Sequence, residues 1–391
     1  MESRLISLKE TVFVTVVTAN HFHYALALRD SISNAYGEDS HLLIVLIDPD
    51  TFKKSGTVID DEFVDAKLLP IANWDRFSFQ YTAFELSCAI KPFAIQYLFN
   101  QGVRKVVYID ADCYLYSRLH SIDRALESHS IALSPHLIES LPADEKSPRE
   151  ILFLSAGAFN GGVVGCLADE PGKAFIRWWM DRLSRDCYID LARGIFVDQK
   201  WLDIVPALFP RSTINRSPAC NTGYWTLQQF DFSGSEVDGY FVGGERLECF
   251  HFSNFLPKNP YQFLRSQERF TFQSLPALKE LVENYHAKLS VHDRDFSKLC
   301  YSMSELSDGT AIKAEWREAL RRNHPTFADI KNPFDVTKTP KIAKQFALVE
   351  RESRKWRGDW QIMSPKKRER RENRRKNGNF WRSLKQRFFG R

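Results

Sequence analysis

The acidic pair Asp110 and Asp112 is the strongest chemical signal in the chain. It follows residues 106–109, an apolar run (VVYI) of the kind that forms a buried strand. In an open α/β sheet, ligands bind at the carboxyl ends of the strands. Mg²⁺ and Mn²⁺ take oxygen ligands from one or two carboxylates and from substrate phosphates. Asp110, Ala111 and Asp112 therefore predict a site for a divalent metal and a phosphate-bearing substrate, although acidic pairs at strand ends also cap helices or lie in solvent.

Two further polar segments could contact a sugar. Asn160, Gly161 and Gly162 offer a side-chain amide and a backbone that a ligand can approach closely. Glycines inside a strand also mark β-bulges, so that alternative stays open. Asp198 and Gln199 could bond sugar hydroxyls, and Asp198 could equally be the N-cap of a helix. Both segments are therefore candidates for the sugar site.

Lys91 and His251 are candidate partners of the acidic pair. Lys91 precedes Pro92 at the start of an expected helix, where its ammonium could neutralise a diphosphate or simply be solvated. His251 follows an expected strand, GERLECF, so its imidazole could reach a metal held by the two aspartates. An ordinary buried, hydrogen-bonded histidine is the alternative.

The segments around these residues alternate between strand and helix patterns. The first part of the chain predicts strands at 11–19, 41–50, 66–70 and 103–116, with helices at 21–37 and 83–102. The next part predicts strands at 130–137 and 155–167, helices at 171–186 and 198–208, and short strands over 230–255. Residues 275–350 are mostly helical in pattern. This alternation predicts an α/β fold with βαβ units and a mainly parallel sheet.

Several of these motifs, in this order, resemble those of the GT-A glycosyltransferases. The closest resemblance is to the retaining glycogenin and galactosyltransferase-like family, glycosyltransferase family 8. The matching segments are TVVTANHFHYALALRDSI, the Lys91 helix with its D-x-D strand, FNGG from Phe159, VDQ from Val197, and FHFSN from Phe250. They span about residues 11–260. The late motif departs from the family's, which continues into Gly and then Lys-Pro-Trp where this sequence has NFLPK.

The resemblance implies a GT-A, Rossmann-like fold: a mixed, mainly parallel sheet flanked by helices. It implies Mn²⁺ or Mg²⁺ as cofactor and a nucleotide sugar, UDP-sugar above others, as donor. Metal ligands would be Asp110, Asp112 and His251. Donor-binding residues would be Thr18, Ala19, Asn20, Lys91, Asp110, Ala111, Asp112, Gly161 and Gly162, and catalytic residues Asn160, Asp198 and Gln199.

Composition and cysteine usage favour a cytoplasmic protein. No segment has the pattern of a signal peptide, and the longest apolar runs fall far short of the ~20 residues of a membrane-spanning helix. The seven cysteines form no CxxC pair, so neither a disulfide framework nor a zinc site is indicated. We therefore expect the cytoplasm, with peripheral attachment to the inner face of the cytoplasmic membrane.

The charge distribution separates a tail from the body. Residues 351–391 contain 16 Lys or Arg and 4 Asp or Glu, leaving 38 basic and 45 acidic residues in 1–350. The tail also places Phe380, Trp381, Leu384 and Phe388 at helical spacing, a pattern typical of segments that lie on anionic membranes. RNA binding and a disordered solubilising tail are the alternatives, with nucleic acid the least favoured. We expect a transferase domain over 1–275, a helical extension over 276–350 and a basic-aromatic tail over 351–391.

The expected activity is transfer of a hexose, with retention, to a hydroxyl of a glycan or glycolipid acceptor in bacterial surface polysaccharide synthesis. The setting is an expectation by analogy. An inverting GT-A enzyme is the first alternative, and would need a carboxylate base such as Asp198 or Asp190. An RNA- or partner-binding protein with a degenerate transferase domain is the alternative from another class.

Overall fold

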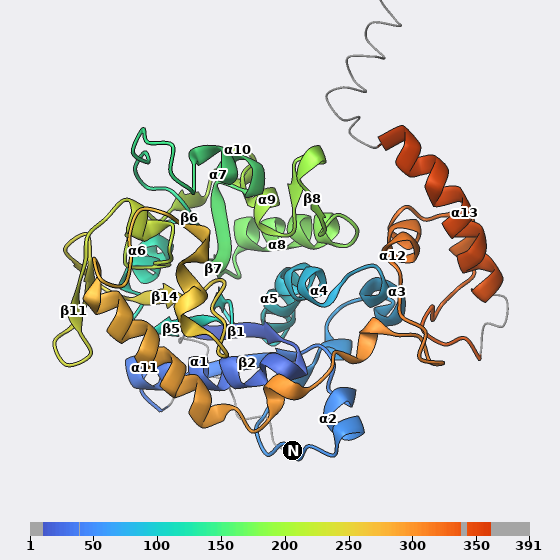
Figure 1. The fold of residues 1–391 in the computed structure, drawn as a ribbon, viewed down its shortest axis with the longest axis horizontal. Coiled ribbons are helices and arrows are strands. Elements are labelled where there is room, and N and C mark those ends of the chain that lie inside the picture. Colours follow the sequence, from blue (N-terminus) through green and yellow to red (C-terminus); the bar gives the residue numbers. More distant parts are fainter. Residues whose placement is uncertain (1–10, 39, 338–341, 361–391) are drawn as a thin grey trace, which may run out of the picture.

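A seven-stranded sheet forms the centre of the molecule (Figure 1). The computed structural model describes residues 11–38, 40–337 and 342–360. The sheet order is β10-β6-β7-β4-β1-β2-β3. The strands are β1 Thr11–Val17, β2 His41–Leu46, β3 Val64–Asp65, β4 Lys105–Ile109, β6 Ile131–Pro135, β7 Phe159–Leu167 and β10 Ser212–Ile214. Only β7 runs against its neighbours, so the prediction of a mainly parallel sheet is confirmed.

Helices cover both faces of this sheet, because its central strands are apolar on both sides. On one face, Val12, Val14 and Val106 share a core with α5 (Lys91–Asn100) and α8 (Glu170–Leu183). On the other face, Phe13 and Val107 pack with α1 (Phe22–Tyr36) and α6 (His120–Ser128). Nearly every residue of β1 and β4 is buried, and successive side chains point alternately into the two cores.

The sequence correctly located most elements but misjudged several boundaries. The predicted strand 103–116 is wrong as one element: β4 ends at Ile109, and β5 (Cys113–Leu115) pairs with β14 (Cys249–His251) in a separate two-stranded sheet. The turn between them is closed by a hydrogen bond from Cys113 N to Asp110 O of 3.0 Å. The turn residues Asp110, Ala111 and Asp112 are thereby lifted out of the central sheet.

Two predicted helices are each divided, for a local reason. Residues 83–102 form α4 (Ala83–Ala89) and α5, which meet at Ile90, two residues before Pro92. Residues 198–208 form α9 (Gln199–Leu202) and α10 (Val205–Leu208), and Pro206 supplies no backbone N–H to continue α9. The predicted strand 66–70 is also wrong, since Ala66–Leu68 is a short 3₁₀ helix after β3. The helices α2 (Asp50–Ser55), α3 (Trp74–Phe79), α6 and α7 (Glu150–Ala156) were not predicted.

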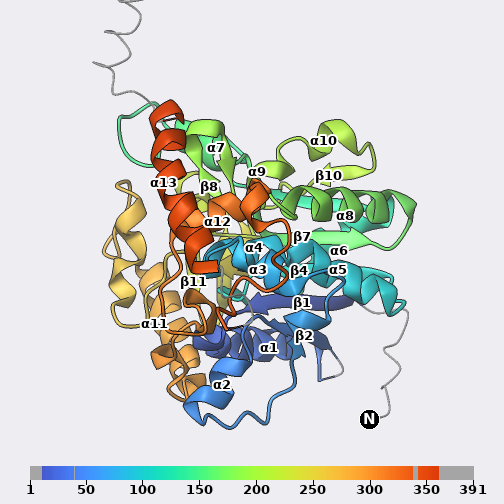
Figure 2. The same cartoon turned by 90° about the vertical axis from the view of Figure 1, so that its right-hand side faces the viewer.

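The C-terminal part wraps around the body. Helix α11 (Pro276–His292) packs on α1, and its Tyr285 ring stacks on Phe252 at 3.6 Å between centroids. Helix α12 (Ala314–Arg321) lies between α3 and α13 (Ile342–Trp360), as Figures 1 and 2 both show. Because α11 shares a core with residues before 275, the predicted boundary there does not separate two cores.

Helix α13 also crosses the boundary expected at 351, so the tail that the structure does not describe is limited to residues 361–391. The predicted membrane-binding pattern of Phe380, Trp381, Leu384 and Phe388 lies outside the described residues. In the described part of the chain, no helix combines the length and apolar composition that crossing a bilayer requires.

Candidate active site

The candidate residues gather at one edge of the sheet. Strands β1, β2 and β4 are parallel, so their carboxyl ends at Val17, Leu46 and Ile109 lie along the same edge. The loop after β1 is fixed to the loop after β2, because the backbone N–H of Ala19 donates to Asp48 Oδ1 at 2.7 Å. These two loops lie beside the turn that follows β4, and we call them together the shelf.

The residues expected to hold the nucleotide lie on this shelf. Thr18 Oγ1 donates to Asn20 Oδ1 at 2.6 Å, and Ala19 is fully buried. Ala111 is partly buried and packs against the same cluster as Ala19. The three loop residues and Ala111 are therefore brought together, at the place where the resemblance puts the donor.

Lys91 lies next to the turn of Asp110, Ala111 and Asp112, which we call the acidic turn. Its ammonium group makes three polar contacts within the protein. Its Nζ is 3.0 Å from Asp110 Oδ1, 3.0 Å from Asp198 Oδ2 and 3.0 Å from the carbonyl oxygen of Gly161. The side chains of Lys91 and Asp198 are 4% and 2% exposed. Burial by itself lowers the pKa of Lys91, but the two carboxylates outweigh it and hold the pKa well above its usual range. Lys91 is thus a buried cation that fixes two carboxylates.

Asp110 is held from two sides. Besides Lys91, it accepts a hydrogen bond from Tyr108 Oη at 2.8 Å, and its backbone N–H donates to Gly162 O at 2.8 Å. Burial raises the pKa of Asp110 above its ordinary value, and the attraction of Lys91 opposes this only in part. Asp110 is therefore held by Lys91 and Tyr108, whereas Asp112 contacts His251.

Asp112 and His251 form the second half of the site. His251 Nε2 lies 3.1 Å from Asp112 Oδ1, and His251 Nδ1 lies 3.2 Å from Asn221 Oδ1. An amide oxygen only accepts, so Nδ1 carries a hydrogen and Nε2 faces the carboxylate. Burial lowers the pKa of His251, but Asp112 raises it above the ordinary value; burial likewise raises the pKa of Asp112, but His251 lowers it. The pair is pre-oriented by Asn221.

These side chains fit a hard divalent cation. Ligand atoms of Asp112, Cys113 and His251 all lie within 4.8 Å of one another. Burial raises the pKa of the Cys113 thiol well above its usual range, so this sulfur stays protonated and is a poor ligand. A carboxylate and an imidazole whose other nitrogen is hydrogen-bonded remain, an arrangement common at metal sites. Asp110, the other expected ligand, is not in this cluster and bonds Lys91 and Tyr108.

Gly161 and Gly162 lie where no side chain fits. A Cβ on Gly161 would overlap Asp198 Oδ2, and a Cβ on Gly162 would lie 2.5 Å from His251 Cε1. The pairing of β6 with β7 also shifts register here, from Leu133 opposite Val164 to Ser134 opposite Asn160. The two glycines therefore lie at an irregularity in the pairing of β6 with β7, and the absence of their Cβ atoms leaves room for Asp198 and His251.

A polar network extends from Asn160 away from the metal ligands. Asn160 Oδ1 accepts from Gly162 N at 2.7 Å and from Asn221 Nδ2 at 2.9 Å. Its Nδ2 is 3.2 Å from His136 Nε2, while His136 Nδ1 donates to Gly157 O at 2.9 Å. Asn160 therefore orients the partner of His251 and is itself oriented by His136.

Asp198 occupies the N-cap position of α9, but its side chain caps no backbone N–H. The residue before it, Val197, has φ of 42° and is 1% exposed. A β-branched residue in the left-handed region is strained by roughly 1–3 kcal/mol, a feature common beside functional groups. This strained turn directs Asp198 toward Lys91. Gln199 Nε2 instead donates to Ala156 O at 3.0 Å.

Sequence reasoning missed Asn221, His136, Tyr108 and Asp48. His136 and Asp48 lie in the last residues of the expected strands 130–137 and 41–50, just beyond the observed ends of β6 and β2, and a polar residue at the carboxyl end of such a strand is a usable signal. Asn221 carried none, because its position depends on the bridge between Thr222 and Phe250, which are distant in sequence.

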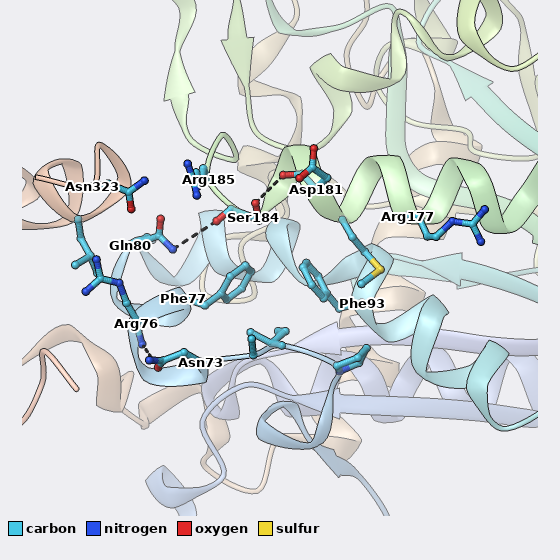
Figure 3. A pocket seen from close by; sticks show the side chains of 15 residues that line it. Asn73, Arg76, Phe77, Gln80, Phe93, Arg177, Asp181, Ser184, Arg185 and Asn323 are labelled. Atoms are coloured by element: carbon cyan, nitrogen blue, oxygen red, sulfur yellow. Dashed lines mark hydrogen bonds between the residues drawn. The ribbon is translucent and has the colours of Figure 1, made fainter. Parts of the chain in front are cut away.

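Two cavities lie apart from these groups. One, of about 540 Å³, is bounded by α3, α5, α8 and α12, and Figure 3 shows the rings of Phe77 and Phe93 in the middle of its lining side chains. The other, of about 420 Å³, lies between α7 and the ends of β6 and β10, next to Phe159. Neither is lined by Lys91, Asp110, Asp112, Asp198 or His251.

Comparisons with known proteins give distant relatives. No protein-family model matches the chain. The uncharacterized protein YfnF of Bacillus subtilis (strain 168) is 26% identical over 280 residues, which is 70% of this chain and 90% of YfnF. YfnD of the same organism, also uncharacterized, is 21% identical over 256 residues, covering 62% of this chain and 77% of YfnD.

Two solved structures are similar at low identity. The galactosyltransferase LgtC, in complex with donor and acceptor sugar analogs, is 12% identical with a TM-score of 0.40, covering 72% of this chain and 96% of that one. The glycosyltransferase GlyE of Streptococcus pneumoniae TIGR4 is 16% identical with a TM-score of 0.40, covering 76% and 67%. Both structural similarities are distant. What the site can do follows from its own side chains.

Proposed function

We propose that this chain is a metal-dependent glycosyltransferase of the GT-A type. Its substrates would be a nucleotide sugar, above all a UDP-sugar, and a hydroxyl of a glycan or glycolipid. One observation carries the proposal: Lys91, Asp110, Asp112, Asp198 and His251, separated by up to 160 positions in sequence, converge at the carboxyl edge of a mainly parallel sheet. The motifs that resemble family 8 are the same residues.

The donor half of the reaction would use the shelf and the acidic turn. Asp112 and His251, with Asp110 beside them, would hold Mn²⁺ or Mg²⁺. A bound divalent cation offsets the negative charge that develops on a nucleoside diphosphate leaving group. The loop at Thr18, Ala19 and Asn20, tied to Asp48, would hold the nucleoside.

The sugar half would use Asn160 and the Asp198–Gln199 turn. Lys91 keeps Asp198 in place through the 3.0 Å ion pair, and the absence of a Cβ at Gly161 leaves room for that contact. Asn160 holds Asn221, which in turn orients His251. These residues therefore position the donor sugar and the metal ligand through one connected network.

Retention is the stereochemical outcome we infer. An inverting enzyme needs a carboxylate that accepts the proton of the incoming hydroxyl. Asp198 is 2% exposed and paired with Lys91, and Asp190 is paired with Arg193 and caps a short helix. Neither is placed to act as that base. A retaining reaction in which the hydroxyl attacks on the leaving-group face needs no such residue, because the departing diphosphate oxygen can accept that proton.

The cellular setting we infer is surface polysaccharide synthesis at the inner face of a bacterial cytoplasmic membrane. The basic-aromatic sequence of 351–391 supports membrane attachment, and the two relatives from Bacillus subtilis support a bacterial setting.

A thermal-shift panel tests the activity class. UDP, GDP, their sugars and an RNA oligonucleotide are added with and without Mn²⁺ to the wild type, to Asp112→Asn, and to Asp60→Asn as an exposed-carboxylate control. We expect UDP to raise the melting temperature only when Mn²⁺ is present, in the wild type and the control but not in Asp112→Asn. Stabilisation by RNA instead, with no response to nucleotides, would favour the binding-protein alternative.

A further inference from the structure

Three neighbouring elements expose aliphatic side chains at one end of the molecule. On α7, Ile151 and Leu154 are 66% and 73% exposed. Ile189 in β8 (Ile189–Asp190) and Leu191 just after it are about half exposed, as is Leu208 on α10. We call this surface the apical face; with Leu152 and Ile204 it comprises Ile151, Leu152, Leu154, Ile189, Leu191, Ile204 and Leu208.

The elements of the apical face form one surface. Helix α7 contacts β9 (Ile195–Phe196), which pairs with β8 and contacts α9. Lys200 of α9 donates to the carbonyl of Leu154, and α9 contacts α10. Figures 1 and 2 both place α7, β8 and α10 at the same, upper end. The exposed side chains are thus neighbours rather than scattered single residues.

This concentration is unusual for a surface that faces only water. In the described part of the chain, fourteen large apolar residues are exposed, and seven of them lie on the apical face. Helix α7 buries Phe153 against the His136 ring, yet Ile151, Leu152 and Leu154 on the same helix are exposed. Exposed apolar patches mark interfaces with proteins or membranes.

The chain that follows points to the partner. Helix α13 ends at Trp360 at the same upper end of the molecule in both views. The next 31 residues, 361–391, contain twelve Lys or Arg and two Glu, together with four aromatic residues. A cationic segment therefore begins at the end of the molecule that carries the aliphatic face. Anionic headgroups over an apolar layer complement both features at once.

We propose that the apical face is a second membrane-contact surface, which rests on an anionic bilayer while residues 361–391 bind its headgroups. The two contacts differ in kind. Attraction between basic residues and headgroups is screened by salt, whereas transfer of aliphatic side chains out of water is not. The folded domain then faces the membrane in one orientation, with α7 and α10 toward the lipid. The proposal does not depend on transferase activity.

Vesicle sedimentation at high salt tests the face itself. Full-length protein is compared as wild type, Ile151→Ser with Leu154→Ser, and a control pair, Val237→Ser with Val291→Ser, whose side chains are 93% and 79% exposed on other elements. The vesicles are phosphatidylcholine with phosphatidylglycerol. At high salt we expect the α7 pair to weaken partitioning by about tenfold or more, and the control pair to leave it unchanged. Leu208→Ser on α10 should weaken it as well.

Other results would overturn the proposal. Equal high-salt partitioning of wild type and both apical variants would mean that the face does not touch lipid. Loss of concentration-dependent self-association in the α7 pair, with vesicle binding intact, would make the face an interface between two copies. All the substituted side chains are exposed, so unchanged thermal midpoints are expected; if the α7 pair fails to fold, Leu208→Ser alone decides.

Discussion

At the scale of single residues, the candidate site contains one buried cation, Lys91, which forms ion pairs with two carboxylates. Lys91 reaches Asp110, Asp198 and a backbone carbonyl with its three donors, so it has none left for a substrate phosphate. The expected diphosphate contact of Lys91 stays a prediction, and its geometry favours a positioning role. Because Asp198 and Gly161 sit on different elements, Lys91 joins the acidic turn to the sugar side of the site.

Lys91→Met should leave both carboxylates without their counter-ion. We expect the free energy of unfolding to fall by about 3 kcal/mol or more, since breaking a buried pair strands a charge. Adding Asp198→Asn to Lys91→Met should restore part of the loss. Urea unfolding of the two single variants and the double variant measures the coupling. Simple additivity of the two losses would show that the 3.0 Å contact contributes nothing.

His136 should make stability fall in mild acid. Burial lowers its pKa to about 4, against an ordinary value of 6.5. Below pH 6.5 the unfolded chain gains a proton at this residue and the folded protein does not, until about pH 4. Stability therefore declines through that window, by up to about 1.4 kcal/mol per pH unit from this group.

His136→Gln should remove that contribution. Urea unfolding of wild type and variant at several pH values between 7 and 5 would show a smaller slope for the variant. Identical slopes would mean that the imidazole is not held neutral by burial. His23, whose pKa is also lowered to about 4 by burial, contributes equally to both proteins.

At the scale of elements, α12 is attached to the body through a buried guanidinium. Arg317 is 6% exposed and donates to the carbonyls of Phe79, Tyr81 and Met303. The aromatic ring of Phe79 and those of Trp316 and Phe346 pack in the same cluster. The helical extension is therefore bonded to the end of α3 and to the loop that precedes α4.

Arg317→Met should destabilise the protein by about 2–3 kcal/mol, because buried carbonyls lose their donor. Arg322→Met at the C-cap of the same helix, which breaks an ion pair with Glu318 nearer the surface, should cost less than about 1 kcal/mol. Chemical unfolding of the two variants makes the comparison. Similar losses would indicate that α12 is held by its apolar contacts alone.

At the scale of the whole molecule, the boundary between folded body and tail lies later than the charge pattern suggested. Phe346 and Val349 are buried, and Glu350 accepts hydrogen bonds from Lys313 and Trp316 at 2.8 and 3.0 Å. A cut at residue 350 would remove half of α13. A cut after Trp360 keeps the described helix whole.

Truncation after Trp360 should leave the thermal midpoint and metal-dependent UDP binding unchanged while lowering the affinity for anionic vesicles at low salt. The lost segment carries twelve basic residues, each worth about 1 kcal/mol near an anionic surface. Sedimentation with vesicles at low salt measures the difference. Equal binding of the truncated and full-length proteins would exclude a membrane role for 361–391, and tighter RNA binding by the full chain would favour the nucleic-acid alternative.

The sequence by itself determined the fold class and the edge at which the chemistry lies. The runs at 11–17 and 105–109 are almost wholly buried on both faces, as is the second half of 41–46, and the apolar composition of all three predicts parallel central strands. The carboxyl ends of such strands share one edge, which placed Thr18 and Asp110 near each other before any coordinates. These inferences need only local pattern and the geometry of a sheet.

Only the tertiary structure decided how the polar groups pair. The strand after Val103 continues in pattern through Tyr116, but the pairing of Cys113 with His251 draws β5 into another sheet and frees the acidic turn. Lys91 lies between Asp110 and Asp198, and Asp198 is 107 positions away from it in the sequence. Asn221 orients His251 from 30 positions away. No local periodicity encodes such contacts, because they depend on how distant side chains pack. The metal ligands and the sugar contacts stay predictions.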